Sequence, residues 1–213
     1  MCIDHSLLRP ELTREEVEAG LAVAAEHRSA TVCVRPADLG LAVERLRGTR
    51  VGPTTVVGFP SGAHLTRIKV AEAEVAAYEG AIELDMVLAI GALRSDLDAE
   101  VGQDIAAVVE AVDPMPVKVI LETAYLSPSE VVRGCRLAAD AGAAFVQNGT
   151  GFSQRGADAE EIALMRRTVG DEVGVKATGG IRSLDTALAI IGAGANRFGA
   201  TATARIAREW HER

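Results

Sequence analysis

Cysteine and basic residues are both scarce in this sequence, and each shortage argues against a class of protein. The three cysteines, Cys2, Cys33 and Cys135, form an odd and sparse set with no metal-ligand spacing. They therefore provide neither a disulfide framework nor a zinc site. The formal net charge is −8 over 213 residues, which leaves no basic patch to neutralise nucleic-acid phosphates. We expect reduced thiols, no metal and no nucleic-acid partner.

Aromatic residues and long apolar runs are also lacking. Only 3% of the residues are aromatic although 48% are hydrophobic, so the core must be built from Ala, Val, Leu and Ile. No apolar run approaches the roughly 20 residues that span a bilayer. No N-terminal segment joins a charged region to an apolar stretch. The sequence predicts a cytoplasmic protein with no membrane partner.

Short apolar segments alternate regularly with amphipathic ones along the whole chain. Strands are predicted at 3–8, 31–34, 54–60, 82–87, 117–123, 145–147, 173–178 and 195–199, and helices at positions that include 37–47, 66–78, 97–112, 158–169 and 202–213. Two further helices begin with the capping boxes Thr13–Glu16 and Ser127–Glu130. Strands separated by helices imply right-handed βαβ units and a parallel sheet. Eight such strands without a composition break predict an α/β fold, a (β/α)8 TIM barrel, as a single domain over residues 1–213.

Four polar residues interrupt the apolar strands, although strands of a parallel barrel are covered on both faces. Period-two alternation directs these side chains toward the barrel axis; they are Asp85, Lys118, Gln147 and Lys176. Any one of them could be a buried polar group satisfied by a neighbour. Two lysines beside an aspartate favour carbonyl chemistry instead, because a lysine near another cation becomes a nucleophile or a base.

Glycine-rich turns follow three of these strands. They are Gly149-Thr150-Gly151, Gly179-Gly180 directly after Thr178, and Gly199-Ala200-Thr201. Backbone N–H groups before a helix bind anions, and the last two strands of a barrel commonly carry a phosphate site. Turn chemistry alone would also explain either of the last two groups. We expect all of these residues to bind the substrate or its phosphate, and we interpret Asp4, His5 and His64 as structural or rim residues.

Several motifs run in order along nearly the whole chain. They include Ile3-Asp4-His5-Ser6-Leu7-Leu8-Arg9-Pro10, Val57-Gly58-Phe59-Pro60, Glu83-Leu84-Asp85-Met86-Val87, Val117-Lys118-Val119-Ile120-Leu121-Glu122-Thr123, Gly149-Thr150-Gly151-Phe152 and Gly174-Val175-Lys176-Ala177-Thr178-Gly179-Gly180-Ile181-Arg182. With these motifs the sequence resembles the deoxyribose-phosphate aldolase family. The resemblance implies a class I aldolase on a (β/α)8 barrel, usually a homodimer, that needs no metal or cofactor. It also implies the reversible joining of acetaldehyde to glyceraldehyde 3-phosphate.

The resemblance assigns roles to some residues and reveals a departure at others. It makes Lys176 the lysine that tunes a pKa, Asp85 the aspartate of a proton relay and Lys118 a further strand lysine. The family's Schiff-base lysine is replaced by Gln147, whose amide nitrogen cannot condense with a carbonyl. Asn148-Gly149 stands where the family has Thr-Ser, and Thr201-Ala202 where it has two serines. These changes gather at the reacting centre and predict altered chemistry on an intact scaffold.

Three hypotheses follow, in order of preference. In the first, an enzyme acts on a small carbonyl compound, with or without a phosphate, and forms no Schiff base. Gln147 and Asn148 orient or polarise the carbonyl, while Lys176, Lys118 and Asp85 supply acid–base or electrostatic help in aldol, cyclisation, isomerisation or dehydration chemistry. In the second, Lys176 becomes the nucleophile and class I aldolase activity persists. In the third, the barrel is a non-catalytic protein that binds a sugar phosphate or has a regulatory role.

Overall fold

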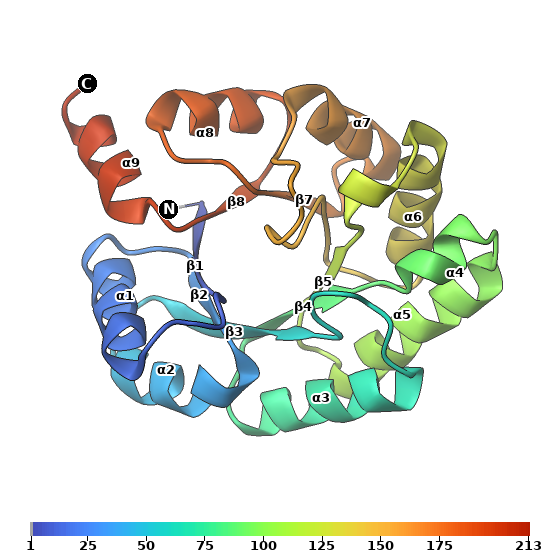
Figure 1. The fold of residues 1–213 in the computed structure, drawn as a ribbon, viewed down its shortest axis with the longest axis horizontal. Helices are drawn as coiled ribbons and strands as arrows, with labels where there is room; N and C mark the ends of the chain where they lie inside the picture. Colours follow the sequence, from blue (N-terminus) through green and yellow to red (C-terminus); the bar gives the residue numbers. More distant parts are fainter. Residues whose placement is uncertain (1) are drawn as a thin grey trace.

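The eight strands close into a parallel barrel surrounded by helices, as the sequence predicts. The structure is a computed structural model that describes residues 2–213. Each strand pairs in parallel with the next, and β8 pairs with β1 to close the ring. The strands are β1 (Ile3–Leu7), β2 (Thr31–Val34), β3 (Gly52–Val57), β4 (Glu83–Val87), β5 (Val117–Ile120), β6 (Phe145–Gln147), β7 (Gly174–Thr178) and β8 (Arg197–Ala200). Figure 1 shows the helices as an outer ring around them.

The helices lie between successive strands, with an additional one after β8. They are α1 (Arg14–Glu26), α2 (Leu39–Leu46), α3 (Thr66–Tyr78), α4 (Ile90–Arg94), α5 (Asp98–Val112), α6 (Pro128–Asp140), α7 (Ala159–Val169), α8 (Leu184–Gly192) and α9 (Thr203–His211), with short 3-10 turns η1 (Pro36–Asp38) and η2 (Thr123–Tyr125). Both predicted capping boxes are present, at Thr13 and at Ser127.

Several expected boundaries are wrong by a few residues, each for a local reason. The strand expected at 117–123 ends at Ile120, because Glu122 adopts a left-handed backbone with φ 53°. The strand expected at 54–60 ends at Val57, since Gly58 has φ 63°. The sequence also gave no sign of α4, because a five-residue helix is too short to show a periodic pattern.

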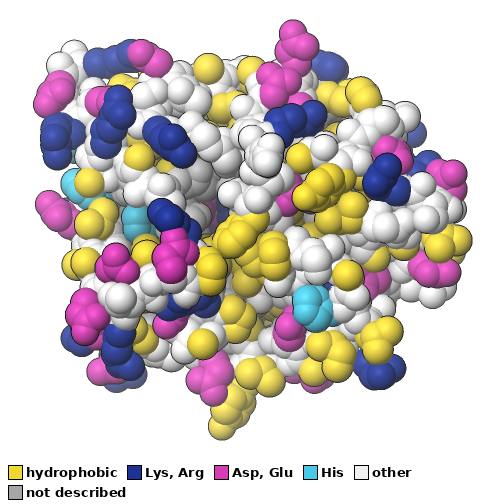
Figure 2. Space-filling model, viewed as in Figure 1, with side chains coloured by type: hydrophobic (Ala, Val, Ile, Leu, Met, Phe, Trp, Pro, Cys, Tyr) yellow, Lys and Arg dark blue, Asp and Glu magenta, His cyan; other side chains and the backbone are white. Residues whose placement is uncertain are grey.

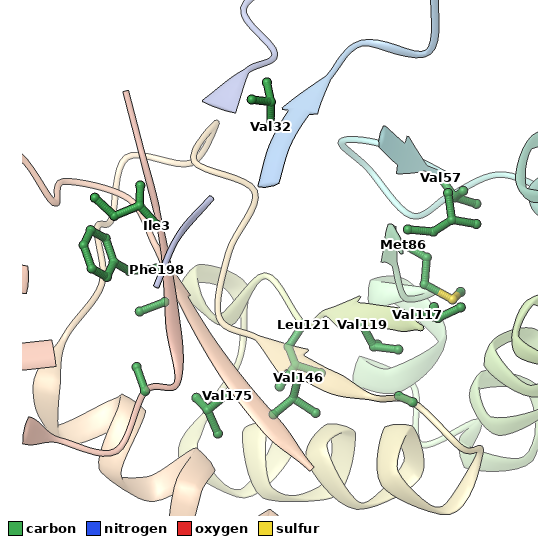
Figure 3. Packing of buried hydrophobic residues seen from close by; sticks show 14 of the residues in the cluster. Ile3, Val32, Val57, Met86, Val117, Val119, Leu121, Val146, Val175 and Phe198 are labelled. Carbon is green, nitrogen blue, oxygen red and sulfur yellow. The ribbon is translucent and has the colours of Figure 1, made fainter. Parts of the chain in front are cut away.

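The apolar core lies between the barrel and the helix ring. Alternate strand residues point outward into it, among them Val119, Val146, Val175 and Phe198, and all of these are buried. Figure 3 shows these side chains directed away from the barrel axis toward the helices. The other half of each strand faces inward, so the interior of the barrel is free to hold the polar residues. No helix formed by residues 2–213 is long and apolar enough to cross a membrane.

His5 fastens the last helix to the first strand. Its Nδ1 lies 2.8 Å from Thr203 Oγ1 in α9, across 198 residues of sequence, and the ring is only 4% exposed. Burial lowers the pKa of His5 to about 4, with a smaller contribution from the charge of His27. The interpretation of His5 as a structural residue agrees with this contact.

We expect the stability of the fold to depend on the protonation of His5. In the unfolded chain its imidazole titrates near pH 6.5. Between that value and about pH 4 the unfolded state binds a proton that the folded state excludes. The free energy of unfolding should therefore fall as the pH is lowered through this window, by about 2 kcal/mol at pH 5. Urea unfolding at pH 7 and pH 5 measures this loss. His5→Gln should reduce it, and an equal loss in both proteins would contradict the assignment.

Candidate functional site

A carboxylate held between two ammonium groups forms the centre of the barrel. Asp85 on β4 accepts a hydrogen bond from Lys118 Nζ on β5 at 3.2 Å through Oδ1, and another from Lys176 Nζ on β7 through Oδ2. All three residues are at most 2% exposed. The structure thus brings together three of the four strand residues that the sequence analysis selected.

Three further charged residues, which the sequence analysis did not select, extend this centre toward the start of the strands. Asp4, interpreted above as structural or rim, lies inside the barrel with Oδ2 3.0 Å from Lys176 Nζ. Arg197 on β8 binds Asp4 and also Glu83, whose Oε1 is 2.9 Å from Arg197 Nη1. Glu83 in turn accepts from Lys118. Three carboxylates therefore face three cations, which compensates their burial. The period-two alternation could have revealed Glu83 and Arg197, because they share a face with Asp85 and Gly199.

The electrostatics of this cluster keep Asp85 and Lys176 ionised. Burial alone would raise the pKa of Asp85, but the charges of Lys118 and Lys176 lower it to about 2. Burial would lower the pKa of Lys176, but the charges of Asp85 and Asp4 raise it above its usual value. Burial beside Asp85 raises the pKa of the Cys33 thiol to about 12, so that thiol is neutral. Lys176 is therefore an ammonium group in this arrangement.

Gln147 lies next to Lys176 on the neighbouring strand but outside the ionic cluster. The two residues are register partners between β6 and β7. The Gln147 amide donates from Nε2 to Gly149 O at 2.7 Å, while its Oε1 is buried with no partner among residues 2–213. This donation fixes which amide atom is the oxygen, because a flipped amide would bring two oxygens together. Gln147 thus presents an unused acceptor.

Asn148 fastens two strands together. Its Nδ2 donates to Thr178 O at 3.1 Å, and its Oδ1 accepts from Thr178 N at 2.6 Å. Both ends of the amide are thus occupied by the backbone of β7. This geometry offers no support for Asn148 as a group that polarises a carbonyl, and it assigns the residue to the alignment of β6 with β7.

The predicted glycine turns meet around one cavity of about 950 Å³ at the mouth of the barrel. Its lining includes Thr150, Gly151, Thr178, Gly179, Gly180, Gly199, Ala200 and Thr201. Gly151, Gly179 and Gly180 have φ values of 80°, 102° and 75°, a backbone region that favours glycine. Gly149 instead lies against the Glu122 carboxylate. Of the predicted binding residues, eight of the nine therefore surround the same space.

The cavity is rimmed by positive charge although the protein is acidic overall. Arg9, Arg182, Arg205 and Arg208 all contribute to its lining. Arg9 and Arg205 also form salt bridges with Glu11 and Glu209 at the surface. The arrangement of glycine turns and arginines suits an anionic group. Among residues 2–213, no three His, Cys, Asp or Glu side chains are placed to hold a metal ion.

Comparison with known proteins identifies the family. The model of the DeoC/LacD family of aldolases matches residues 1–204. A deoxyribose-phosphate aldolase of Caldanaerobacter subterraneus subsp. tengcongensis is 48% identical over 211 residues, which is 98% of this chain and 91% of that protein. Deoxyribose-phosphate aldolase 1 of Cutibacterium acnes is 46% identical over 200 residues, covering 94% of this chain and 92% of its own.

Solved structures agree with these sequence relatives. An aldolase designated QR15 superposes with a TM-score of 0.95 at 35% identity, over 100% of this chain and 95% of its own. The tetrameric deoxyribose phosphate aldolase from Aeropyrum pernix superposes with a TM-score of 0.88 at 27% identity, over 99% of this chain and 89% of its own. The shared fold, the matched family model and the sequence identity lead to one conclusion: this chain belongs to the DeoC/LacD aldolase family and is a lyase of the deoxyribose-phosphate aldolase type.

Proposed function

We propose that this protein is a class I aldolase that cleaves deoxyribose 5-phosphate to acetaldehyde and glyceraldehyde 3-phosphate, with Lys176 as its Schiff-base amine. The observation that carries the proposal is a buried lysine on the strand that leads directly into an anion-binding cavity. Lys176 and Thr178 share the inward face of β7, and Thr178 lines the cavity. The relatives are named as deoxyribose-phosphate aldolases, which favours a class I mechanism with Lys176 as nucleophile over the Schiff-base-free mechanism inferred from Gln147.

The phosphate of the substrate would bind at the mouth of the barrel. The Gly179-Gly180 turn after β7 would present backbone N–H groups to it, and Arg182 and Arg208 line the same cavity. Thr178 Oγ1 is buried with no partner among residues 2–213, so it is available to a sugar hydroxyl. A phosphate held at the rim would direct the aldehyde end of the sugar down β7 toward Lys176.

The amine chemistry is then that of a class I aldolase. The free amine of Lys176 attacks C1 of the open-chain sugar, and loss of water gives an iminium ion. The C3 hydroxyl loses its proton as the C2–C3 bond breaks, which releases glyceraldehyde 3-phosphate and leaves an enamine. Protonation at C2 and hydrolysis release acetaldehyde and restore Lys176. Asp85, directly beside the amine, is placed to stabilise the cationic iminium.

The Asp85 and Asp4 carboxylates also make Lys176 a weaker nucleophile, because they favour its protonated form. Asp85 and Asp4 raise the pKa of Lys176, so the ammonium must lose a proton before it can attack. A lysine at the family's Schiff-base position would lower the pKa of Lys176 by charge repulsion. Gln147 stands at that position and carries no charge. We therefore expect a slow enzyme whose rate rises with pH.

The Schiff-base-free mechanism remains the second candidate, because one observation favours it. Gln147 Oε1 is a buried acceptor without a partner among residues 2–213, and Gln147 lies beside Lys176. In that mechanism Gln147 accepts a hydrogen bond from a substrate hydroxyl, and the Lys176 ammonium stabilises the oxyanion that develops on the carbonyl.

We also propose that the protein is a homodimer that pairs through α3. Ile68, Val75 and Tyr78 project from this helix with exposures of 43%, 61% and 90%. Figure 2 shows hydrophobic side chains gathered along the lower edge of the molecule, where α3 lies in Figure 1. An exposed apolar helix face of this kind is typical of an oligomer contact.

Borohydride trapping separates the three hypotheses. Wild-type protein incubated with deoxyribose 5-phosphate and borohydride should gain the mass of a reduced adduct, located on Lys176 by peptide mapping and absent from Lys176→Met. Its yield should increase between about pH 7 and about pH 9, because the neutral amine is the nucleophile. Cleavage without an adduct would identify the Schiff-base-free mechanism. If the protein shows no cleavage and no adduct, the result would favour a barrel that binds the substrate without catalysis.

Gln147→Lys should increase the rate of deoxyribose 5-phosphate cleavage by roughly tenfold or more, because a second ammonium lowers the pKa of its neighbour and supplies an amine at the family's position. The trapped adduct should then appear at position 147. Gln147→Met, of similar length but without an amine, serves as the control. Kinetics of both variants make this comparison, and a folded Gln147→Lys no faster than wild type would argue against the expectation.

Tyr78→Glu should convert the dimer to a monomer, since it places a charge within the proposed apolar contact. Light scattering after size-exclusion chromatography measures the molar mass. Trp210→Glu changes an apolar side chain of similar exposure, 58%, on α9 and should leave the mass unchanged. A monomeric wild-type protein would refute the proposed contact.

A further inference from the structure

Glu122 occupies an unusual position directly after β5. Its backbone is left-handed, with φ 53° and ψ 61°, in a chain where few non-glycine residues have positive φ. Such a conformation is costly for a residue with a side chain and persists when the surroundings hold it in place. The side chain is only 3% exposed. The backbone strain and the burial together indicate that the carboxylate is held there by its contacts.

The contacts of this carboxylate all lie in the loop between β6 and α7. Oε2 accepts from Thr150 N at 3.1 Å and also from Thr150 Oγ1, while Oε1 accepts from Ser153 Oγ at 3.0 Å. Among residues 2–213, no lysine or arginine forms a salt bridge with Glu122. A buried carboxylate satisfied entirely by neutral donors orders those donors strongly, because hydrogen bonds to a charged acceptor are the stronger kind.

The loop that Glu122 holds forms one wall of the cavity. Thr150 Oγ1 accepts from Phe152 N at 3.0 Å, so the hydrogen-bond chain runs from Glu122 through Thr150 to Phe152. Thr150, Gly151 and Phe152 all line the cavity. A Cβ added to Gly149 would lie 3.1 Å from Glu122 Oε1, which shows how closely the carboxylate lies against this backbone. Phe152 also packs edge-on against Phe59, with ring centroids 5.1 Å apart.

We propose that Glu122 is a positioning residue that fixes the Thr150–Phe152 wall of the anion-binding cavity. It touches neither the cavity nor the reacting amine and acts through the loop. Without the carboxylate, the Gly151 N–H would lose its fixed direction toward the anion, and phosphate affinity would fall. This inference rests on the phosphate site of the proposed function but not on any aldolase chemistry.

A neighbouring carboxylate offers a matched control. Glu161 on α7 accepts from Thr123 Oγ1 at 2.8 Å and pairs with Arg155. It therefore braces the same turn after β5 but bonds none of the residues 149–152. Loss of charge at Glu161 should affect stability in much the same way as loss at Glu122. Only the change at Glu122 should alter the cavity wall.

The test is isothermal titration of the full-length protein with inorganic phosphate. Glu122→Gln keeps the size of the side chain but turns one of the two acceptor oxygens into an NH2 group, which opposes the donors of either Thr150 or Ser153. We expect it to weaken phosphate binding roughly tenfold, whereas Glu161→Gln leaves it unchanged. In kinetics with deoxyribose 5-phosphate, KM should rise for Glu122→Gln with little change in kcat. A residue with a merely structural role would not produce that separation.

A second variant covers the case in which Glu122→Gln does not fold. Ser153→Ala removes one of the three hydrogen bonds and should weaken phosphate binding roughly twofold to threefold. Equal phosphate affinity in wild type and the folded Glu122 or Ser153 variant would overturn the proposal, as would equal losses in Glu122→Gln and Glu161→Gln. A wild type that binds no phosphate would overturn it too, even if aldolase activity were found. If the wild-type protein had no aldolase activity but bound phosphate, and Glu122→Gln weakened that binding, the positioning role of Glu122 would be supported. Only the proposed function would then be refuted.

Discussion

The rest of the site depends on the ion pairs that the Asp85 carboxylate forms with two lysines. The carboxylate accepts from Lys118 and Lys176 in the centre of the barrel, where water is excluded and an uncompensated charge would be very costly. Two ammonium groups around one carboxylate leave a net positive charge, and Asp4 and Glu83 balance it from the layer below together with Arg197. The three carboxylates and the three cations compensate one another's charge. The register of the five strands that carry them sets the geometry of this cluster.

The ionic cluster and the cavity occupy different parts of the barrel, since none of the six charged residues of the cluster lines the cavity. Charged side chains, among them Lys176, fill the interior of the barrel. The cavity with its glycine turns and arginines lies above. This order follows from parallel strands, because their carboxyl ends meet at the same mouth and successive inward residues form successive layers. Under the proposed function, a substrate anchored by its phosphate at the rim would be directed along β7 toward Lys176.

Gln147 lies beside Lys176 on the neighbouring strand without joining the ionic cluster. Its amide carries no charge, whereas the charges of Asp85 and Asp4 raise the pKa of Lys176 against the effect of burial. The amide is accommodated by a hydrogen bond to Gly149 O, and Asn148 aligns β6 with β7 through Thr178. The loop that follows Gln147 is held separately by Glu122, which accepts a hydrogen bond from Thr150 N.

The sequence by itself determined the fold and the polar residues inside the strands. Eight apolar segments separated by amphipathic ones admit few arrangements, and period-two alternation correctly directed Asp85, Lys118 and Lys176 inward. Tertiary structure alone decided which groups meet. Asp4 and Arg197 are 193 residues apart and pair because β8 closes against β1, a contact that no local pattern records. The same holds for Glu122, since neither its left-handed backbone nor its reach to Thr150 follows from its neighbours in the chain. Local sequence sets the direction of each side chain, whereas the closure and register of the barrel set its partners.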